Sequence, residues 1–182
     1  MLNHGADPNA RIKDVGSPLH VASLMNRKEV TEILLSHSAD VNSTNDSGIT
    51  PLHLAVQTIG SLNRVEVAKV LIAHSADVNS AAHYGWTPLH MAAIENSVEA
   101  AKVLIANSAK VNSPDKNGAT PLSLAALYNS VGVAKVLIAN SADVVTSFVT
   151  PLQIAEMEGH KEMIELLKNS PQRVHDVNFP LM

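Results

Sequence analysis

The chain has 182 residues, 46% of them hydrophobic but only 3% aromatic, so we expect a core built mainly from Ala, Val, Leu and Ile. Its 13 basic and 17 acidic residues give a formal net charge of −4, which argues against a nucleic-acid surface and against a polybasic membrane patch. The absence of cysteine excludes disulfides and thiolate metal sites. No apolar run is long enough to span a membrane, and residues 1–14 lack the apolar core of a secretory signal. We therefore expect a soluble, cytoplasmic protein, with a nuclear location left open.

Nearly the same six-residue segment occurs five times along the chain. The copies are SPLHVA from Ser17, TPLHLA from Thr50, TPLHMA from Thr87, TPLSLA from Thr120 and TPLQIA from Thr150. Self-similarity at a period in the thirties is typical of a solenoid array.

Each copy predicts the start of a short helix, because a Ser or Thr hydroxyl caps a free backbone N–H and Pro fits the first helical position. We expect these helices to end near residue types that tolerate a left-handed conformation, namely Asn26, Asn63, Asn96, Asn129 and Gly159. A second helix should follow, with its buried face formed by Val30, Ile33, Leu34; Val67, Val70, Leu71; Val103, Leu104; and Val133, Val136, Leu137.

The solvated faces of these second helices carry oppositely charged pairs, Glu66 with Lys69 and Glu99 with Lys102. Helices of about ten residues are marginal in isolation. Only stacking of one repeat on the next buries both faces of each helix pair, so the sequence predicts an all-α repeat solenoid.

The TPLHxA segments, the Val- and Leu-rich second helices and the following AD-V-N turns closely resemble ankyrin repeats. The resemblance covers roughly residues 1–170. It implies short β-hairpin fingers set at right angles to two layers of antiparallel helices, with a concave groove. We expect one domain over residues 1–170, with a partial repeat in 1–12 and repeats starting near 14, 47, 84, 117 and 147. Residues 171–182 are expected to be a flexible tail.

The chain departs from the family pattern at the turn after each second helix. The usual Gly is present at Gly5 but is replaced by Ser38, Ser75, Ser108 and Ser141. A left-handed Ser costs on the order of 1 kcal/mol relative to Gly. The alternative is that Asn107 and Asn140 take up part of the turn. The second repeat also has four extra residues within 57–64, and the fifth finger is three residues short, with Val145 in place of the turn Asn.

The two ends of the array are expected to differ. The last helix, HKEMIELLKN, has alternating charges that suit a polar cap over the final core layer. Residues 1–12 match only the end of a second helix and its turn. We therefore expect Leu19 and Ile33 to be poorly covered, either because the natural chain is longer or because another molecule covers that edge.

The histidines and the HSAD segments do not predict a metal, cofactor or catalytic site. His20, His53 and His90 occupy the same position of successive repeats, about one helix diameter (~10 Å) apart, too far for one metal to bridge. In the family this His is a structural hydrogen-bonding residue. The Ser, His and Asp of HSAD at 37–40 and 74–77 recur with the fold and do not converge as a triad would. We expect no enzyme and no cofactor.

Positions where the repeats disagree are candidates for partner binding, because the fold does not fix them. These positions are Ser47, Ile49, His83, Tyr84, Trp86, Ile94, Glu95, Lys116, Asn117, Leu127 and Tyr128. Tyr and Trp dominate interface energetics, although Trp86 also suits packing along its own hairpin. The extra loop at 59–62 is a second candidate. By resemblance alone, Asn42 and Asn79 match turn asparagines that intracellular hydroxylases modify.

The sequence thus favours a non-catalytic, monomeric protein-binding module that docks a protein partner through its fingers and groove. The alternative is a regulatory or targeting fragment of a larger enzyme, channel or bacterial effector. Binding of nucleic acid is disfavoured because the basic residues form no stripe, and no membrane insertion is expected.

Overall fold

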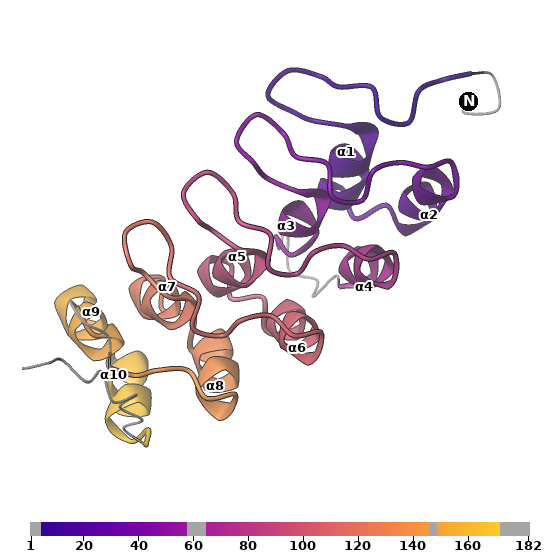
Figure 1. The fold of residues 1–182 in the computed structure, drawn as a ribbon. Helices are drawn as coiled ribbons and strands as arrows, with labels where there is room; N and C mark the ends of the chain where they lie inside the picture. Colours follow the sequence, from indigo (N-terminus) through magenta and orange to yellow (C-terminus); the bar gives the residue numbers. More distant parts are fainter. Residues whose placement is uncertain (1–4, 58–64, 146–148, 172–182) are drawn as a thin grey trace, which may run out of the picture.

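The computed structural model describes residues 5–57, 65–145 and 149–171. In these ranges the chain forms ten helices, arranged as five consecutive pairs. The pairs are α1 (Pro18–Leu24) with α2 (Lys28–Ser36), α3 (Pro51–Ala55) with α4 (Glu66–Ala73), α5 (Pro88–Ile94) with α6 (Val98–Ala106), α7 (Pro121–Leu127) with α8 (Val131–Ala139), and α9 (Pro151–Glu158) with α10 (Lys161–Lys168). Figure 1 shows the odd-numbered helices in one row and the even-numbered helices in a second row, with loops projecting beside the first row. The predicted helical repeat array is confirmed.

Every odd-numbered helix begins as the sequence predicts. The preceding Ser or Thr has extended backbone angles and Pro occupies the first turn in all five cases. The backbone N–H of Ser123 donates to the hydroxyl oxygen of Thr120 at 3.3 Å, and that of Gln153 donates to Thr150 at 3.2 Å. These bonds satisfy amide groups that have no partner within the helix.

The helices also end where expected. Asn26, Asn96, Asn129 and Gly159 have φ angles of 50°, 51°, 54° and 73°, whereas Asn63 lies outside the described residues. Ser38, Ser75, Ser108 and Ser141 are left-handed, with φ between 65° and 69°. Asn107 and Asn140, in contrast, both have φ of −105°, so the alternative that these asparagines take up part of the turn is wrong.

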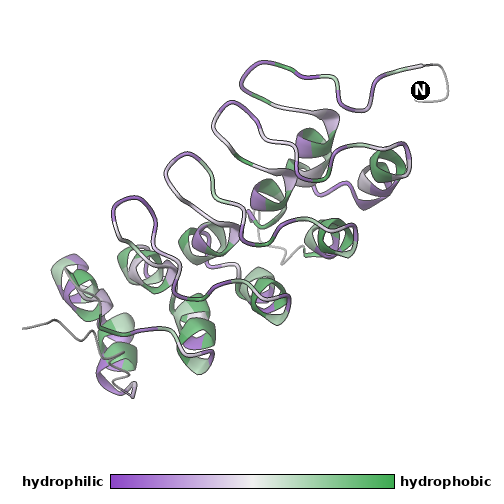
Figure 2. Ribbon diagram, viewed as in Figure 1, coloured by the Kyte–Doolittle hydropathy of each residue, from purple (hydrophilic) through white to green (hydrophobic). Residues whose placement is uncertain are grey.

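The core is a continuous apolar seam between the two rows of helices. At most 1% of the surface is exposed in seven of its leucines: Leu19, Leu52, Leu89 and Leu122 in the odd-numbered helices, and Leu71, Leu104 and Leu137 in the even-numbered helices. Figure 2 shows hydrophobic residues concentrated on the helices, whereas the projecting loops are mainly hydrophilic or neutral. Truncation of a buried leucine of this kind to Ala typically lowers the free energy of unfolding by about 2–5 kcal/mol. Because these leucines lie between neighbouring helices, much of the stability of each repeat comes from its contact with the next.

The fingers, residues 12–16, 45–49, 82–86 and 115–119, are hairpin-shaped but form no β-strand in the described part of the chain, where one isolated bridge joins Ile12 and Gly16. In the other three fingers one N–H crosses the loop to a carbonyl, from Asn45 to Ile49, from Ala82 to Trp86 and from Asp115 to Ala119, at 2.8–2.9 Å. The residue that follows each returning arm is already a helix N-cap, so a ladder of strand pairs has no room to form.

The N-terminal edge differs from the expectation in part. Leu19 is fully buried, so the prediction that it is poorly covered is wrong; it belongs to the core where α1 packs on α2 and α3. Ile33 is 52% exposed, which agrees with the expected poor cover of this edge but not with its expected place on the buried face of the second helix. Val30, expected on the buried face of its helix, is 46% exposed, whereas Val67 and Val133 at the equivalent positions are fully buried.

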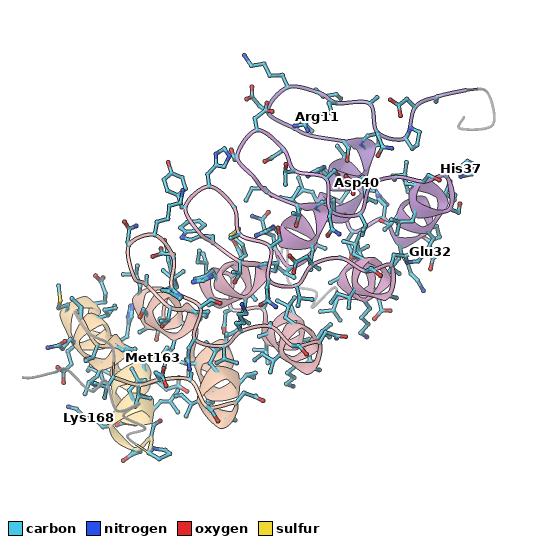
Figure 3. All side chains as sticks on the ribbon, viewed as in Figure 1. Arg11, Glu32, His37, Asp40, Met163 and Lys168 are labelled. Atoms are coloured by element: carbon cyan, nitrogen blue, oxygen red, sulfur yellow. The ribbon has the colours of Figure 1, made fainter. Side chains whose placement is uncertain are left out.

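The C-terminal edge is polar, as the sequence suggests. In α10 only Met163 and Leu167 are buried, and Lys168 pairs with Glu156 of α9 at 3.2 Å. Figure 3 shows Met163 and Lys168 on this last helix. Residues 146–148 of the shortened fifth finger lie outside the described residues, as does the tail from 172 onward.

The left-handed serines provide a direct test of the turn geometry. Ser75→Gly should raise the free energy of unfolding by about 0.5–1 kcal/mol, because Gly adopts positive φ without the steric penalty of a β-carbon. Urea unfolding of the two proteins measures the change. Ser75→Ala is the matched control, since Ala keeps the β-carbon and should give no gain. A glycine variant that is no more stable than the alanine variant would contradict the prediction.

Candidate functional site

The predicted partner-binding residues fall into two groups on the row of odd-numbered helices. The fingertip group comprises Ser47, Ile49, His83, Tyr84, Trp86, Lys116 and Asn117. The helix-end group comprises Ile94, Glu95, Leu127 and Tyr128, which close the first helices of the third and fourth repeats. Because each odd-numbered helix begins beside its finger, the two groups lie along opposite borders of this row.

Short polar side chains shape the second and fourth fingers. The side-chain oxygen Oδ1 of Asn45 accepts the backbone N–H groups of Ser47 and Ile49, both at 3.0 Å. Oδ1 of Asp115 accepts those of Asn117 and Ala119 at 2.8 and 2.9 Å. Asx turns of this kind hold a tight loop in one conformation. The exposed side chains at the tips are therefore carried on a fixed backbone.

Trp86 and Tyr84 share one finger but have different surroundings. The indole N–H of Trp86 donates to Oδ2 of Asp115 in the next finger at 3.2 Å, and the ring is partly buried against the core. Tyr84 is 69% exposed, with its ring centroid 6.4 Å from that of Trp86. Trp86 thus supports the array and buttresses Tyr84, while Tyr84 presents free aromatic surface.

The other predicted residues also divide by exposure. Ile49 and Ile94 are partly buried, and Ile94 packs against the core. Ser47, His83, Glu95, Lys116 and Asn117 are exposed. Leu127 and Tyr128 are 39% and 52% exposed. The extra loop at 59–62 lies outside the described residues.

The three repeated histidines are enclosed in hydrogen bonds. The backbone N–H of Thr50 donates to Nδ1 of His53 at 3.2 Å, so Nε2 carries the proton and donates to the carbonyl of Trp86 at 2.9 Å. His20 makes the same contacts with Ser17 and with the carbonyl of Ile49, and His90 with Thr87 and with the carbonyl of Ala119. Each imidazole joins the cap of its own helix to the next finger, and neither ring nitrogen is left for a metal or a substrate.

Burial lowers the pKa of each of these histidines. The pKa of His53 falls to about 4, because desolvation of the charged ring outweighs the hydrogen bond to Trp86. Desolvation likewise lowers the pKa of His20 and of His90. The neutral imidazole is the form that the fold requires.

A ladder of asparagine side chains, not predicted from the sequence, links successive repeats. Nδ2 of Asn42 donates to the carbonyl of Ser75 at 3.2 Å, while its Oδ1 accepts the N–H of Asp77 at 2.8 Å. The same two bonds run from Asn9 to Ser38 and Asp40, from Asn79 to Ser108 and Lys110, and from Asn112 to Ser141 and Asp143. The recurrence of Asn in four of the five turns was the available signal.

The predicted hydroxylation at Asn42 and Asn79 therefore falls on two rungs of this ladder and stays a prediction. Among the described residues, no group of three or more His, Asp or Glu side chains is placed to hold a metal ion. Nor does any described helix have the length and apolar character needed to cross a membrane.

The chain matches the family model of ankyrin repeats (three copies) over residues 1–82 and again over 61–147. It is 44% identical over 55 residues to the ARF GTPase-activating protein Git of Drosophila melanogaster, covering 30% of this chain and 8% of that protein. Two proteins of fowlpox virus (strain NVSL), named as ankyrin repeat proteins FPV031 and FPV024, are 44% and 42% identical over 57 and 53 residues. Those matches cover 31% and 29% of this chain but 17% and 9% of the viral proteins. The chain thus spans less than a fifth of the length of these curated relatives.

The histidine pKa predicts acid sensitivity with a definite sign. Above pH 6.5, His53 is neutral in both the folded and the unfolded state. Below pH 6.5, the unfolded chain binds a proton at His53, whereas the folded chain does not bind it until about pH 4. The free energy of unfolding therefore decreases as the pH is lowered from 6.5 to about 4. His53→Gln should lower stability at pH 7, yet its deficit relative to the native protein should shrink by about 2 kcal/mol at pH 5.

Urea unfolding at both pH values measures this difference. Gln is a suitable replacement because Oε1 of Gln153 accepts the N–H of Thr150 in the last repeat, as Nδ1 of His53 does for Thr50. An identical deficit at the two pH values would show that His53 is not held neutral by the fold.

The asparagine ladder predicts a second stability effect. Asn79→Ala removes two hydrogen bonds to the following repeat and should lower the free energy of unfolding by about 1–3 kcal/mol. Asn117→Ala is the matched control, because this exposed fingertip makes no side-chain hydrogen bond to the described residues and should change little. Equal losses from the two substitutions would refute a specific role for the ladder.

Proposed function

This chain belongs to the ankyrin repeat family, whose repeats are protein-interaction modules, and from that premise we propose that it is a non-catalytic adaptor for a protein partner. The partner binds through the fingertips and the face of the odd-numbered helices. In this proposal the chain acts as a monomer in the cytoplasm.

The observation that carries the proposal is that polar side chains that recur from repeat to repeat are hydrogen-bonded within the array, whereas two aromatic side chains that are not repeated are exposed. The repeated ones are engaged within the array: His53 holds the next finger and Asn79 holds the next turn. The unrepeated Tyr84 and Tyr128 project from the same rigid frame with most or half of their surface exposed. Exposed tyrosines on a preorganised scaffold are the kind of residue that dominates protein interfaces.

The same hydrogen bonds argue against catalysis by the repeated histidines. A general base needs a lone pair within reach of a substrate proton. In His20, His53 and His90 the unprotonated nitrogen already accepts from a backbone N–H. The ankyrin fold is in general a non-enzymatic interaction fold, which agrees with this assignment.

A second candidate function is that the array is a regulatory or targeting part of a larger protein. The observation that favours it is that the matched segments make up only 8% to 17% of the relatives' lengths. An immunoblot of the source cells with antibodies against this chain distinguishes the two candidates. A band at the size of 182 residues supports the free adaptor, and a much larger band supports the fragment.

The tyrosines give the test of the proposed surface. A Tyr84→Ala/Tyr128→Ala double variant should lose a partner that the native protein captures from lysate, with binding weakened about tenfold or more. Quantitative mass spectrometry of the two pull-downs measures the loss, after thermal melts have shown equal stability.

Ile33→Ala serves as the control, because Ile33 is exposed to a similar extent as Tyr128 but lies on α2, in the other row of helices. Retention of the partner by the double variant, or an equal loss with Ile33→Ala, would place the interface elsewhere.

A further inference from the structure

The tips of the third and fourth fingers form one continuous surface, which we call the fingertip strip and define as His83, Tyr84, Lys116 and Asn117. The backbone N–H of Lys116 donates to the carbonyl of Tyr84 at 3.0 Å, joining the two tips directly. A β-carbon on Gly85 would lie 2.9 Å from the backbone nitrogen of Lys116, so the fingers are in close contact. The strip is therefore a shared surface of two repeats.

The strip is held in one conformation by groups beneath it. The Asp115 carboxylate accepts N–H groups from Asn117 and Ala119 on one oxygen and the indole N–H of Trp86 on the other. The N–H of His83 donates in turn to the carbonyl of Ser47 at 3.0 Å. Binding to this strip requires little ordering of the backbone, which favours affinity.

The exposed formal charge of the strip is positive and comes from Lys116. Its supporting acid, Asp115, is 9% exposed and directed at internal donors. Lys116 is exposed and makes no ion pair within the described ranges. The first two fingers differ, because Arg11, labelled in Figure 3, pairs with Asp46 at 3.3 Å and Asp46 also accepts the N–H of Asp14. Arg11 beside the first finger is thus compensated by Asp46, whereas the exposed Lys116 of the fourth finger and Lys13 of the first make no ion pair within the described ranges.

We propose that the fingertip strip docks an acidic peptide segment of the protein partner, with an apolar side chain on Tyr84 and a carboxylate on Lys116. This assignment rests on the proposed protein-binding function and specifies the chemistry of its partner. The exposed ring of Tyr84, buttressed by Trp86, supplies apolar contact area. The ammonium group of Lys116 supplies charge complementarity, which selects the partner and speeds encounter.

A single-stranded nucleic acid also combines stacking groups with negative charge, but the strip suits it poorly. Affinity for a phosphate backbone comes from several cations, each neutralising a phosphate. The strip offers Lys116 alone, on a chain whose formal net charge is −4. An acidic peptide requires no such row of cations.

The test uses peptide libraries of stated charge and a reporter inside the site. Two bead-displayed libraries of short peptides mix Phe, Leu, Ser and Gly with either Asp and Glu or Lys and Arg, and the captured sequences are titrated in solution. Trp86 is the single tryptophan of the chain, so its emission reports binding beside Tyr84. We expect captured acidic peptides to bind about tenfold or more tightly than basic ones, and the difference to shrink at high salt.

Two charge reversals separate the strip from general electrostatics. Lys116→Glu should reverse the preference between the libraries. Lys13→Glu, on the first finger, makes the same change of charge at another exposed lysine and should leave the preference intact. Tyr84→Ala should weaken the binding of peptides from both libraries. Thermal melts confirm that all variants are folded.

Capture of no acidic peptide, equal binding of the two libraries, or tighter binding of a mixed-sequence single-stranded oligonucleotide would overturn the proposal. The protein-binding function is tested separately. Suppose that a lysate partner requires Tyr84 and Tyr128 but binds equally well to the Lys116→Glu variant. That result would support the proposed protein-binding function and refute the proposal that the bound segment is acidic.

Discussion

Stacking of one repeat on the next is the constraint on which the structure depends. The helices are five to nine residues long, which is too short for stable helices in water. Each becomes stable because its leucine and alanine face is covered by neighbouring helices, as with Leu89 in α5 and Leu104 in α6. Removal of one repeat would therefore expose core on both sides of the gap, and cooperativity between neighbours follows from this geometry.

Polar interactions set the register of the stack rather than provide its main stabilisation. His53 reaches from a helix cap to the next finger, and Asn42 reaches from one turn to the next. Each bond contributes only modestly on balance, but a buried donor or acceptor left without its partner is costly. A repeat that rotates or slides relative to its neighbour leaves these groups unpaired, so the same contacts that fix the spacing also hold the fingertips in place.

The two edges of the array are chemically different. At the position of the buried Ala93 and Ala126, the last odd-numbered helix has Glu156, which pairs with Lys168. The first pair instead exposes Val30, whose equivalents in the four later repeats, Val67, Ala100, Val133 and Met163, are buried. A charged residue in place of a small apolar one suits a solvent-facing edge, because burial of that carboxylate against another apolar layer would be costly.

The sequence by itself determined the helical repeat array, the starts of five helices and the left-handed ends of the first helices, because Ser/Thr-Pro caps and left-handed Asn or Gly act through local sterics and local hydrogen bonds. It left open whether Ser or a neighbouring Asn takes the left-handed conformation after each second helix. It also indicated the structural role of His20, His53 and His90 through the resemblance of the repeats. Only the tertiary structure decided which side chains meet across repeats. The asparagine ladder, the Trp86–Asp115 bond and the exposure of Val30 depend on the separation and rotation of neighbouring pairs, which no single repeat specifies. The same reason separates Tyr84 from Trp86: two residues apart in one finger, they differ in exposure because the next repeat supplies a carboxylate to one and leaves the other facing solvent.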